Sequence, residues 1–158
     1  MKINWAELKI DLSKINLKNL LESWEWLIGN DKKIILISTI GDAFLEDSNG
    51  ICYWLNVGEG IFEKVAENIT EFETKLTNNE IVEDWFLVEL VEELKKSGIK
   101  LIENNIYSYK TFPILGGEYL PENFEITDIE VHFEISGQIY KQVKDLPVRT
   151  KINKVEIK

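Results

Sequence analysis

The stretch from residue 33 to residue 66 constrains the fold of this chain more than any other. Its apolar and β-branched runs are interrupted at three places, by Gly41-Asp42, Ser48-Asn49-Gly50 and Gly58-Glu59-Gly60. Glycine and asparagine adopt positive φ angles at low steric cost, so each interruption is typical of a turn between strands. We therefore predict a β-meander. The run from Ile51 to Val57 is apolar on both faces, which places it in the middle of the sheet with other elements packed above and below.

The residues before the meander predict a helix that packs on one of its faces. Trp5, Leu8 and Ile10 are the expected anchors of an irregular or short-strand lead-in over residues 1–14. From Asn16 onward, apolar residues recur at helical spacing and form one stripe: Leu17, Leu20, Leu21, Trp24, Leu27 and Ile28. Gly29-Asn30 then provides a stop signal at the C-terminal end of this helix.

The residues after the meander predict two further helices. Asn68 and Thr70 are both suitable N-caps for a short helix. A longer helix is expected to begin at Thr77-Asn78-Asn79 and to end at Ser97-Gly98. Its apolar residues lie on two nearly opposite sides. Such a helix is either covered on both sides or broken near Trp85; in a third interpretation, its first turns face another chain, which allows a dimer.

The C-terminal third mixes extended and helical patterns. Residues 99–108 are expected to be extended, and Pro113 together with Gly116-Gly117 permits a tight, exposed turn. Residues 128–144 fit a helix with a Thr127-x-x-Glu130 capping box, which would bring together Ile129, Phe133, Ser136, Tyr140 and Val143. The same residues also alternate, so a strand that breaks at Gly137 is the competing interpretation.

The C-terminal segment and the length of the chain complete the structural prediction. Alternating Ile152, Val155 and Ile157 predict an edge strand that lysines protect from further pairing. A chain of 158 residues fits one domain and buries a substantial core. We therefore predict an α+β fold, in which helices pack on a mainly antiparallel sheet, and a single domain over residues 1–158.

The charge balance restricts the partners of the chain. Lys and Arg total 18 against 28 Asp and Glu, so the net charge is −10. Nucleic acids and anionic membranes both require a cationic protein surface, so we expect neither as a direct partner. An acidic protein suits a basic partner, whose approach the opposite charge accelerates. In the alternative interpretation, the charge only keeps the protein soluble.

The chain contains few of the residue types that perform catalysis or bind metals. Its single cysteine, Cys52, lies in the most apolar run, where we expect a buried thiol and a reducing compartment. Its single histidine, His132, excludes most histidine-dependent catalytic and zinc arrangements, and we expect it at the surface or half-buried. Gly58-Glu59-Gly60 lacks the Lys-Ser/Thr of a phosphate-binding loop and is predicted to be a hairpin turn. We therefore predict no catalytic residue, no metal site and no cofactor.

The location of the chain is predicted from two absences. The first residues are charged and lack the apolar segment and cleavage site of a signal peptide, so we expect none. No apolar run approaches the ~20 residues of a membrane-spanning helix. We expect a cytoplasmic protein.

Carboxylates are dense on both sides of the Gly-Gly turn, with few basic residues between them. The acidic residues are Glu118, Glu122, Glu125, Asp128, Glu130 and Glu134. One interpretation is a solvated acidic surface. The other is a patch that meets a cationic groove on a protein partner.

Several stretches of the sequence resemble the C-terminal domain of type VI secretion DNase-immunity proteins. The most specific are residues 113–119 (PILGGEY), Gly137-Gln138-Ile139 and the following Lys144-Asp145-Leu146-Pro147. Residues 41–66 also match, and this part is similar to the wider SMI1/KNR4-like immunity superfamily. The resemblance extends from about residue 15 to residue 152. It implies an intracellular, non-enzymatic protein that binds and neutralises a co-encoded toxin, with a basic nuclease as one candidate.

A turn with exposed backbone, carboxylates and one aromatic ring is the expected contact region for such a partner. The predicted partner-binding residues are Leu115, Gly116, Gly117, Glu118, Tyr119, Glu122 and Gln138. We expect the two glycines to set the shape of the loop, and Gln138 either to contact the partner or to satisfy the loop backbone. Two alternatives remain open: a small-molecule-binding or regulatory domain whose Gly-Gly loop lines a pocket, and a hydrolase that uses two of the carboxylates.

Overall fold

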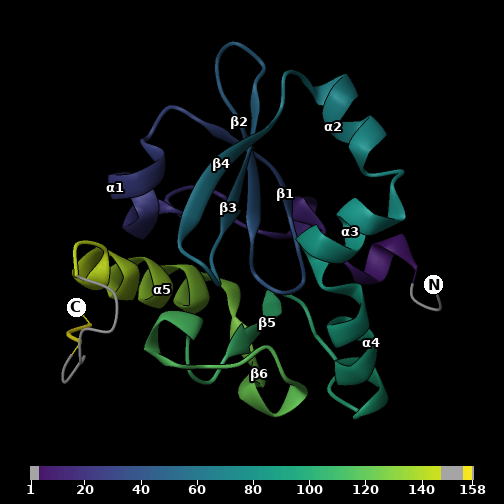
Figure 1. Ribbon diagram of the computed structural model, residues 1–158, viewed down its shortest axis with the longest axis vertical. Coiled ribbons are helices and arrows are strands. Elements are labelled where there is room, and N and C mark those ends of the chain that lie inside the picture. Colours follow the sequence, from purple (N-terminus) through teal and green to yellow (C-terminus); the bar gives the residue numbers. More distant parts are fainter. Residues whose placement is uncertain (1–3, 147–154, 158) are drawn as a thin grey trace.

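The predicted meander forms the centre of the molecule in a computed structural model that describes residues 4–146 and 155–157. Four strands pair antiparallel in sequence order (Figure 1): β1 (Lys33–Ile37), β2 (Ala43–Glu46), β3 (Cys52–Asn56) and β4 (Ile61–Ala66). The fold is α+β, as predicted. The expected position of β3 is also confirmed, because it is an inner strand whose Cys52, Trp54 and Leu55 side chains are buried.

An aromatic cluster joins the meander to two helices, α2 (Ile69–Lys75) and α3 (Asn79–Phe86). The ring of Phe44 on β2 lies 5.3 Å from the ring of Phe72 and 5.3 Å from that of Trp85, measured between centroids. Buried aromatic rings supply much of the burial energy of a core. Asn68 is the cap of α2, since its side chain accepts a hydrogen bond from the backbone N–H of Glu71 (2.8 Å).

The long helix predicted after Thr77 is broken. Leu87 adopts a left-handed conformation (φ 50°) between α3 and α4 (Val88–Lys96). This break, two residues after Trp85, confirms one of the interpretations derived from the two apolar sides of the sequence pattern. One apolar side of the predicted helix belongs to α3 and the other to α4, because the chain changes direction between these two helices (Figure 1).

The helix predicted from Asn16 to Ile28 is wrong over its first half. Asn19 has a φ of 62°, and the helical structure is limited to η3 (Glu22–Trp24) and α1 (Glu25–Ile28). The apolar stripe still reaches the core, with Leu20, Leu21, Trp24 and Ile28 buried. The turns therefore bury the same side chains as a helix would, and Gly29 (φ 77°) ends α1 as predicted.

Over residues 4–14 the lead-in is irregular, in agreement with one of the two alternatives for this segment. It contains two short 3-10 turns, η1 (Trp5–Glu7) and η2 (Leu12–Lys14). Leu8 is fully buried between them, and Lys9 forms an isolated bridge to Ser38.

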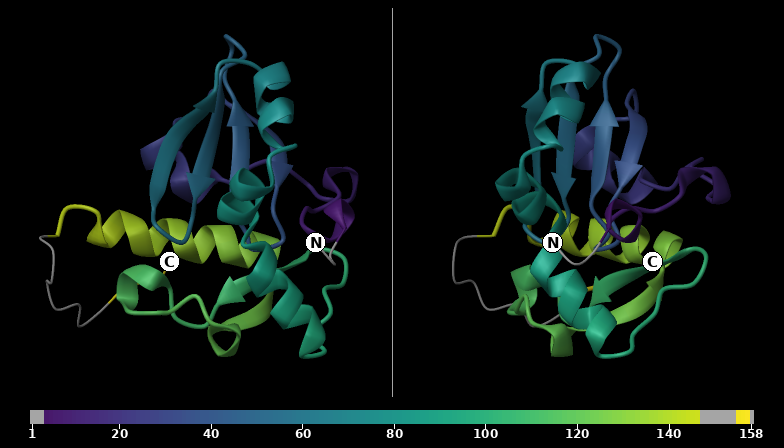
Figure 2. Two further views of the ribbon diagram at one scale, coloured as in Figure 1. Left: turned by 45° about the vertical axis from the view of Figure 1, so that its right-hand side comes forward. Right: turned by 90° about the vertical axis from the view of Figure 1, so that its right-hand side faces the viewer.

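A second sheet and a long helix close the open end of the meander. β5 (Asn105–Tyr109) and β6 (Phe124–Asp128) form an antiparallel pair, with η4 (Pro113–Leu115) and η5 (Pro121–Asn123) between them. Figure 2 shows α5 (Ile129–Val143) between this sheet and the meander. No helix among the described residues is long and apolar enough to span a membrane.

The helical interpretation of residues 128–144 is correct, but its cap is not Thr127. The side chain of Asp128 accepts hydrogen bonds from the backbone N–H groups of Glu130 (2.9 Å) and Val131 (3.2 Å). The residues predicted to lie together on this helix are all buried: Ile129, Phe133, Ser136, Tyr140 and Val143. For the tail, Ile152 lies outside the described residues, and residues 155–157 are not part of a strand.

Candidate partner-binding surface

The Gly-Gly loop, residues 112–120, connects the two strands of the smaller sheet. It begins with the η4 turn, which Gly116 ends at a φ of 99°. Gly117 has a different role: a Cβ atom there would lie 1.7 Å from the backbone oxygen of Thr111, so only glycine fits. Both glycines therefore set the shape of the loop, one through its dihedral angles and the other through its close approach to the backbone.

A single side chain holds the two ends of the loop together. The amide of Asn123 accepts a hydrogen bond from the N–H of Thr111 (3.0 Å) and donates to its carbonyl oxygen (2.9 Å). The same amide nitrogen also donates to the carbonyl of Glu118 (2.9 Å). With its backbone groups paired in this way, the loop does not depend on a partner for its shape.

The loop is also attached to the meander, at the turn between β3 and β4. Tyr119 donates a hydrogen bond to the carboxylate of Glu59, and Tyr140 from α5 donates to the carbonyl of Gly58. Burial raises the pKa of both tyrosines well above the usual range, so both hydroxyls remain donors at neutral pH. A Cβ at Gly58 would lie 2.6 Å from the hydroxyl of Tyr119, which explains the glycine at this contact.

Four apolar side chains of this region are exposed although they belong to a well-fixed loop. The exposed fractions are 42% for Ile114, 36% for Leu115, 39% for Tyr119 and 43% for Leu120. The exposed carboxylates of Glu59, Glu118 and Glu122 accompany them. We call these seven residues the loop surface. Apolar groups grouped on a surface with a charged rim are typical of protein-binding sites.

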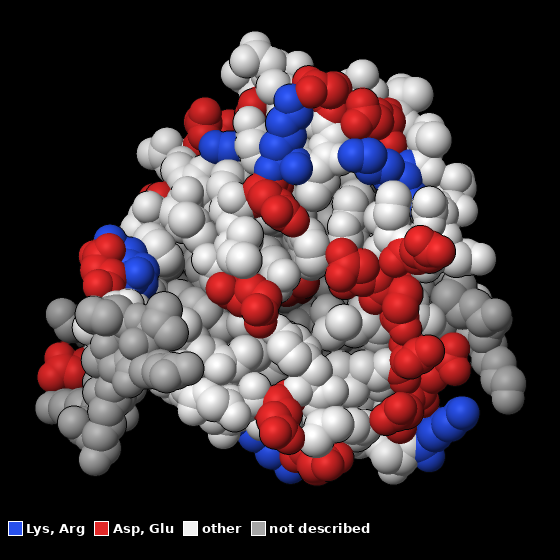
Figure 3. All heavy atoms as spheres, in the orientation of Figure 1, with Lys and Arg blue, Asp and Glu red and all other residues white. Residues whose placement is uncertain are grey.

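Acidic residues predominate in the segment that carries the loop surface, although exposed Lys110 borders it. Residues 111–140 contain six carboxylates and no lysine or arginine. On the face shown in Figure 3, further carboxylates gather over α3 and α4. A cationic partner would therefore be attracted toward this side of the molecule.

The structure does not bring all the predicted residues together. Leu115 to Tyr119 form the loop, and Glu122 follows directly in η5. Gln138 instead lines a hollow with Trp26 and Lys141, and its backbone oxygen accepts a hydrogen bond from Gln142 (3.2 Å). The residues that line this hollow do not include any residue of the Gly-Gly loop.

A buried carboxyl group that the sequence reasoning missed lies beneath the region. Asp42 accepts hydrogen bonds from Trp54 Nε1 (3.1 Å) and from the backbone N–H of Val57 (2.9 Å). Desolvation raises the pKa of Asp42 from 3.8 to about 7. The sequence context, Gly41-Asp42, indicated only a turn, because the partner Trp54 lies on another strand.

The prediction that His132 lies at the surface or is half-buried is wrong. Its side chain is fully buried, with Nδ1 2.7 Å from Ser108 Oγ and Nε2 2.8 Å from the carbonyl oxygen of Gly41. A carbonyl oxygen only accepts, so Nε2 carries the proton and Nδ1 accepts from the serine. Burial lowers the pKa of His132 to about 4, so the ring is a neutral structural link between α5, β5 and the meander.

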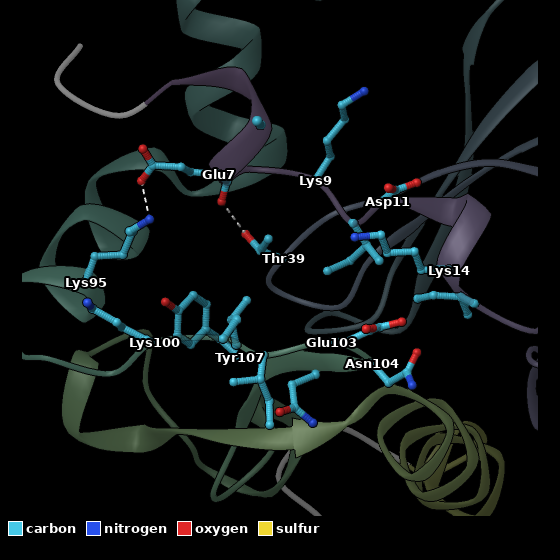
Figure 4. Close-up of a pocket in the computed structure, with 16 residues that line it drawn as sticks. Glu7, Lys9, Asp11, Lys14, Thr39, Lys95, Lys100, Glu103, Asn104 and Tyr107 are labelled. Carbon is cyan, nitrogen blue, oxygen red and sulfur yellow. Dashed lines mark hydrogen bonds and ion pairs between the residues drawn. The ribbon is translucent and has the colours of Figure 1, made fainter.

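A separate pocket of about 490 Å³ lies beside the N-terminal segment. Figure 4 shows that its lining carries several lysines, including Lys14, Lys95 and Lys100, and that Glu7 points toward Lys95, with which it forms an ion pair. Thr39 Oγ1 donates a hydrogen bond to the carbonyl oxygen of Glu7 (3.2 Å) at the inner end. The Gly-Gly loop contributes no residue to this pocket, so the pocket gives no support to the alternative in which that loop lines a ligand site.

The comparison with known families concerns the part of the chain that contains this loop. The model of the family described as T6SS immunity protein Tdi1, C-terminal, matches residues 66–140, from the end of β4 through most of α5. No curated protein matches the chain. The resemblance expected from the sequence is thereby confirmed over residues 66–140, which are similar to the C-terminal domain of the T6SS immunity protein Tdi1.

Proposed function

We propose that this chain binds a cognate secreted bacterial toxin and neutralises it by covering the toxin's working surface, without turning over a substrate. The family match gives the immunity class. The observation that carries the interface is the loop surface, whose exposed Leu115 and Tyr119 are held on a rigid support beside three carboxylates. A preorganised apolar group loses little entropy when a partner covers it.

Leu115 and Tyr119 are the proposed anchors of the interface. Both side chains are partly exposed in the free protein, so a partner that covers them removes apolar area from water at about 25 cal/mol per Å². Aromatic residues near the centre of an interface commonly dominate its affinity. The hydrogen bond to Glu59 fixes the ring of Tyr119 before binding, which favours a slow dissociation rate.

The acidic rim favours a basic nuclease as the toxin. A nuclease must present cationic groups to the phosphates of its substrate. The six carboxylates of residues 111–140, with no cation between them, are complementary to such a groove. The proposed place of action is the cytoplasm, where the buried thiol of Cys52 remains reduced.

Charge reversal at the loop surface tests this proposal. The toxin encoded by the neighbouring gene is co-expressed with the wild-type chain, and its affinity is measured at several salt concentrations. We expect rescue of growth by the wild type, and about tenfold slower association with a weaker salt dependence for the double variant Glu118→Lys/Glu122→Lys.

A second double variant with the same change in net charge is the control. Glu25→Lys/Glu73→Lys reverses exposed carboxylates on α1 and α2, away from the Gly-Gly loop (Figure 1). We expect near-wild-type association from this control. Equal effects of the two double variants would reject the loop surface as the toxin interface. Absence of toxin binding by the wild type would reject the proposed function.

The competing function is small-molecule binding at the pocket of Figure 4. The observation in its favour is a partly apolar lining that carries four lysines against three carboxylates, Glu7, Asp11 and Glu103, a slight excess of positive charge that suits an anionic ligand. A thermal-shift screen of small carboxylates and phosphates distinguishes the two functions. A raised melting temperature that Lys14→Ala abolishes would favour ligand binding over toxin binding.

A further inference from the structure

The outer strand of the smaller sheet, β6, has an unpaired edge within the described residues. The sheet contains only β5 and β6, and the opposite edge of β5 is covered, since the N–H of Tyr107 donates to the carbonyl of Thr39 (2.8 Å). Figure 2 shows this sheet at the end of the molecule opposite the turn between β2 and β3. β6 is therefore the strand whose free edge faces outward.

The register shows which backbone groups of β6 point outward. The N–H of Lys110 donates to Asn123 at one end of the pair, and the N–H of Ile129 donates to Asn104 at the other. Bonded and non-bonded pairs alternate in an antiparallel ladder, so Glu125 and Thr127 bond inward to β5. The N–H and C=O groups of Ile126 consequently point away from β5, and so do the C=O of Phe124 and the N–H of Asp128. The N–H of Phe124 is not free, because it donates to the carbonyl of Pro121 in η5, and the C=O of Asp128 belongs to the N-cap of α5.

This edge lacks most of the devices that usually prevent pairing with another chain. Its charged residues, Glu125 and Asp128, are both acidic and would repel only an acidic strand. β6 contains neither lysine nor proline, its middle residue Ile126 is 40% exposed, and five consecutive residues are extended without a shift in register. Natural edge strands are typically protected by lysine, proline, a bulge or a covering element. An edge without these features accepts an additional strand.

The charges beside the free edge of β6 favour one kind of additional strand. Glu122, Glu125, Asp128 and Glu130 are exposed within and next to β6, in a stretch that has no basic residue between 111 and 140. A strand rich in lysine and arginine would bring opposite charges next to each of them. An acidic or neutral strand would gain the backbone bonds alone.

We propose that β6 binds an extended, basic segment of the toxin by β-augmentation, so that the segment becomes a third strand of the β5–β6 sheet. This inference rests on the proposed function and specifies the mode of binding. The N–H and C=O of Ile126, the C=O of Phe124 and the N–H of Asp128 supply the backbone hydrogen bonds. The neighbouring carboxylates supply the preference for a basic segment.

Residue-resolved amide exchange of the wild-type chain tests the proposal without any substitution. In the free protein, we expect slow exchange at the amides of Glu125 and Thr127 and fast exchange at the amide of Ile126. With the neighbouring gene's toxin bound, we expect exchange at Ile126 to slow at least tenfold, while Glu125 and Thr127 change little. A contact made through side chains alone would not produce this alternation, and unchanged exchange at Ile126 in the complex overturns the proposal.

A proline substitution tests the same group by affinity. Ile126→Pro removes an N–H that makes no bond within the sheet, whereas the control Ile126→Val keeps it. We expect about tenfold weaker toxin binding for the proline variant, with near-wild-type binding for the valine variant. Equal affinities overturn the proposal. If the proline variant fails to fold, the exchange measurement on the wild type decides.

The outcomes separate this inference from the proposed function. A toxin that binds the wild type and leaves the amide of Ile126 unprotected overturns only the β-augmentation. A wild-type chain that does not bind the toxin overturns both. Reduced binding by the Glu118→Lys/Glu122→Lys variant together with an unprotected Ile126 amide would restrict the interface to the loop surface.

Discussion

Tyr119 donates a hydrogen bond from its hydroxyl to the carboxylate of Glu59, a residue 60 positions earlier in the chain. This contact joins the Gly-Gly loop to the turn between β3 and β4. Neither residue belongs to a regular element, so the loop surface depends on a tertiary contact between two turns. Its rigidity can therefore be changed without altering a helix or a strand.

The first prediction concerns this hydrogen bond. Tyr119→Phe keeps the aromatic ring and leaves the carboxylate of Glu59 without its donor, so we expect the free energy of unfolding to fall by about 1 kcal/mol. Toxin affinity should fall as well, because the loop becomes less ordered before binding. Chemical denaturation and a binding titration measure the two effects.

A matched control is available on the other side of the meander. Tyr53 donates a similar hydrogen bond to Asp47 (3.0 Å). Tyr53→Phe should lower stability and leave toxin affinity unchanged. Equal losses of affinity in the two variants would contradict a specific role for the loop.

The second prediction separates the two glycines of the loop. Gly116→Ala forces alanine into a left-handed conformation with no atom within 4 Å of the new Cβ, and it should cost about 1–2 kcal/mol of stability. Gly117→Ala places a methyl group against the backbone of Thr111, so the hydrogen bonds of Asn123 must break and the loss should be larger. Denaturant unfolding of both variants provides the comparison, and a larger loss for Gly116→Ala would contradict it.

The third prediction concerns pH. Asp42 has a folded-state pKa of about 7 against 3.8 when unfolded, so its contribution to stability is fully present below pH 3.8 and is lost as the pH rises through 7. Asp42→Asn removes this titration. We therefore expect the variant to become more stable relative to the wild type as the pH rises from 4 to 7, as measured by unfolding at several pH values.

His132 provides a control of opposite sign for this experiment. Its folded-state pKa of about 4 lies below the unfolded value of 6.5, so its contribution is present above pH 6.5 and is lost as the pH falls through 4. His132→Ala should thus gain stability relative to the wild type as the pH falls. The same trend in both variants would contradict the assignment of the two buried groups.

Much of the architecture was predictable because its signals are local. The glycine-containing turns of the meander and the cap at Asn68 each depend on the conformational preference of a few adjacent residues. Two apolar sides on one helical segment also left open, as one of three interpretations, the break that Leu87 makes. The helical spacing of apolar residues from Asn16 to Ile28 was misleading. Turns bury the same apolar residues there without forming a continuous helix.

The candidate site was only partly predictable. The sequence identified the loop from Leu115 to Tyr119 through its Gly-Gly pair and its family resemblance. It did not identify Glu59 or Tyr140, which support the loop from other elements. Gln138 was included through its sequence context alone, and the structure places it beside Trp26.

By itself, the sequence determined the meander, most helix boundaries and the acidic character of the C-terminal third, because these follow from residue type and spacing. Only the tertiary structure decided the burial of Asp42 and His132 and the attachment of the loop. Each of these depends on a partner that is distant in sequence, such as Gly41 for His132, 91 positions away. Hydrogen bonds of this kind form when separate elements pack together, and no property of the adjacent residues specifies them.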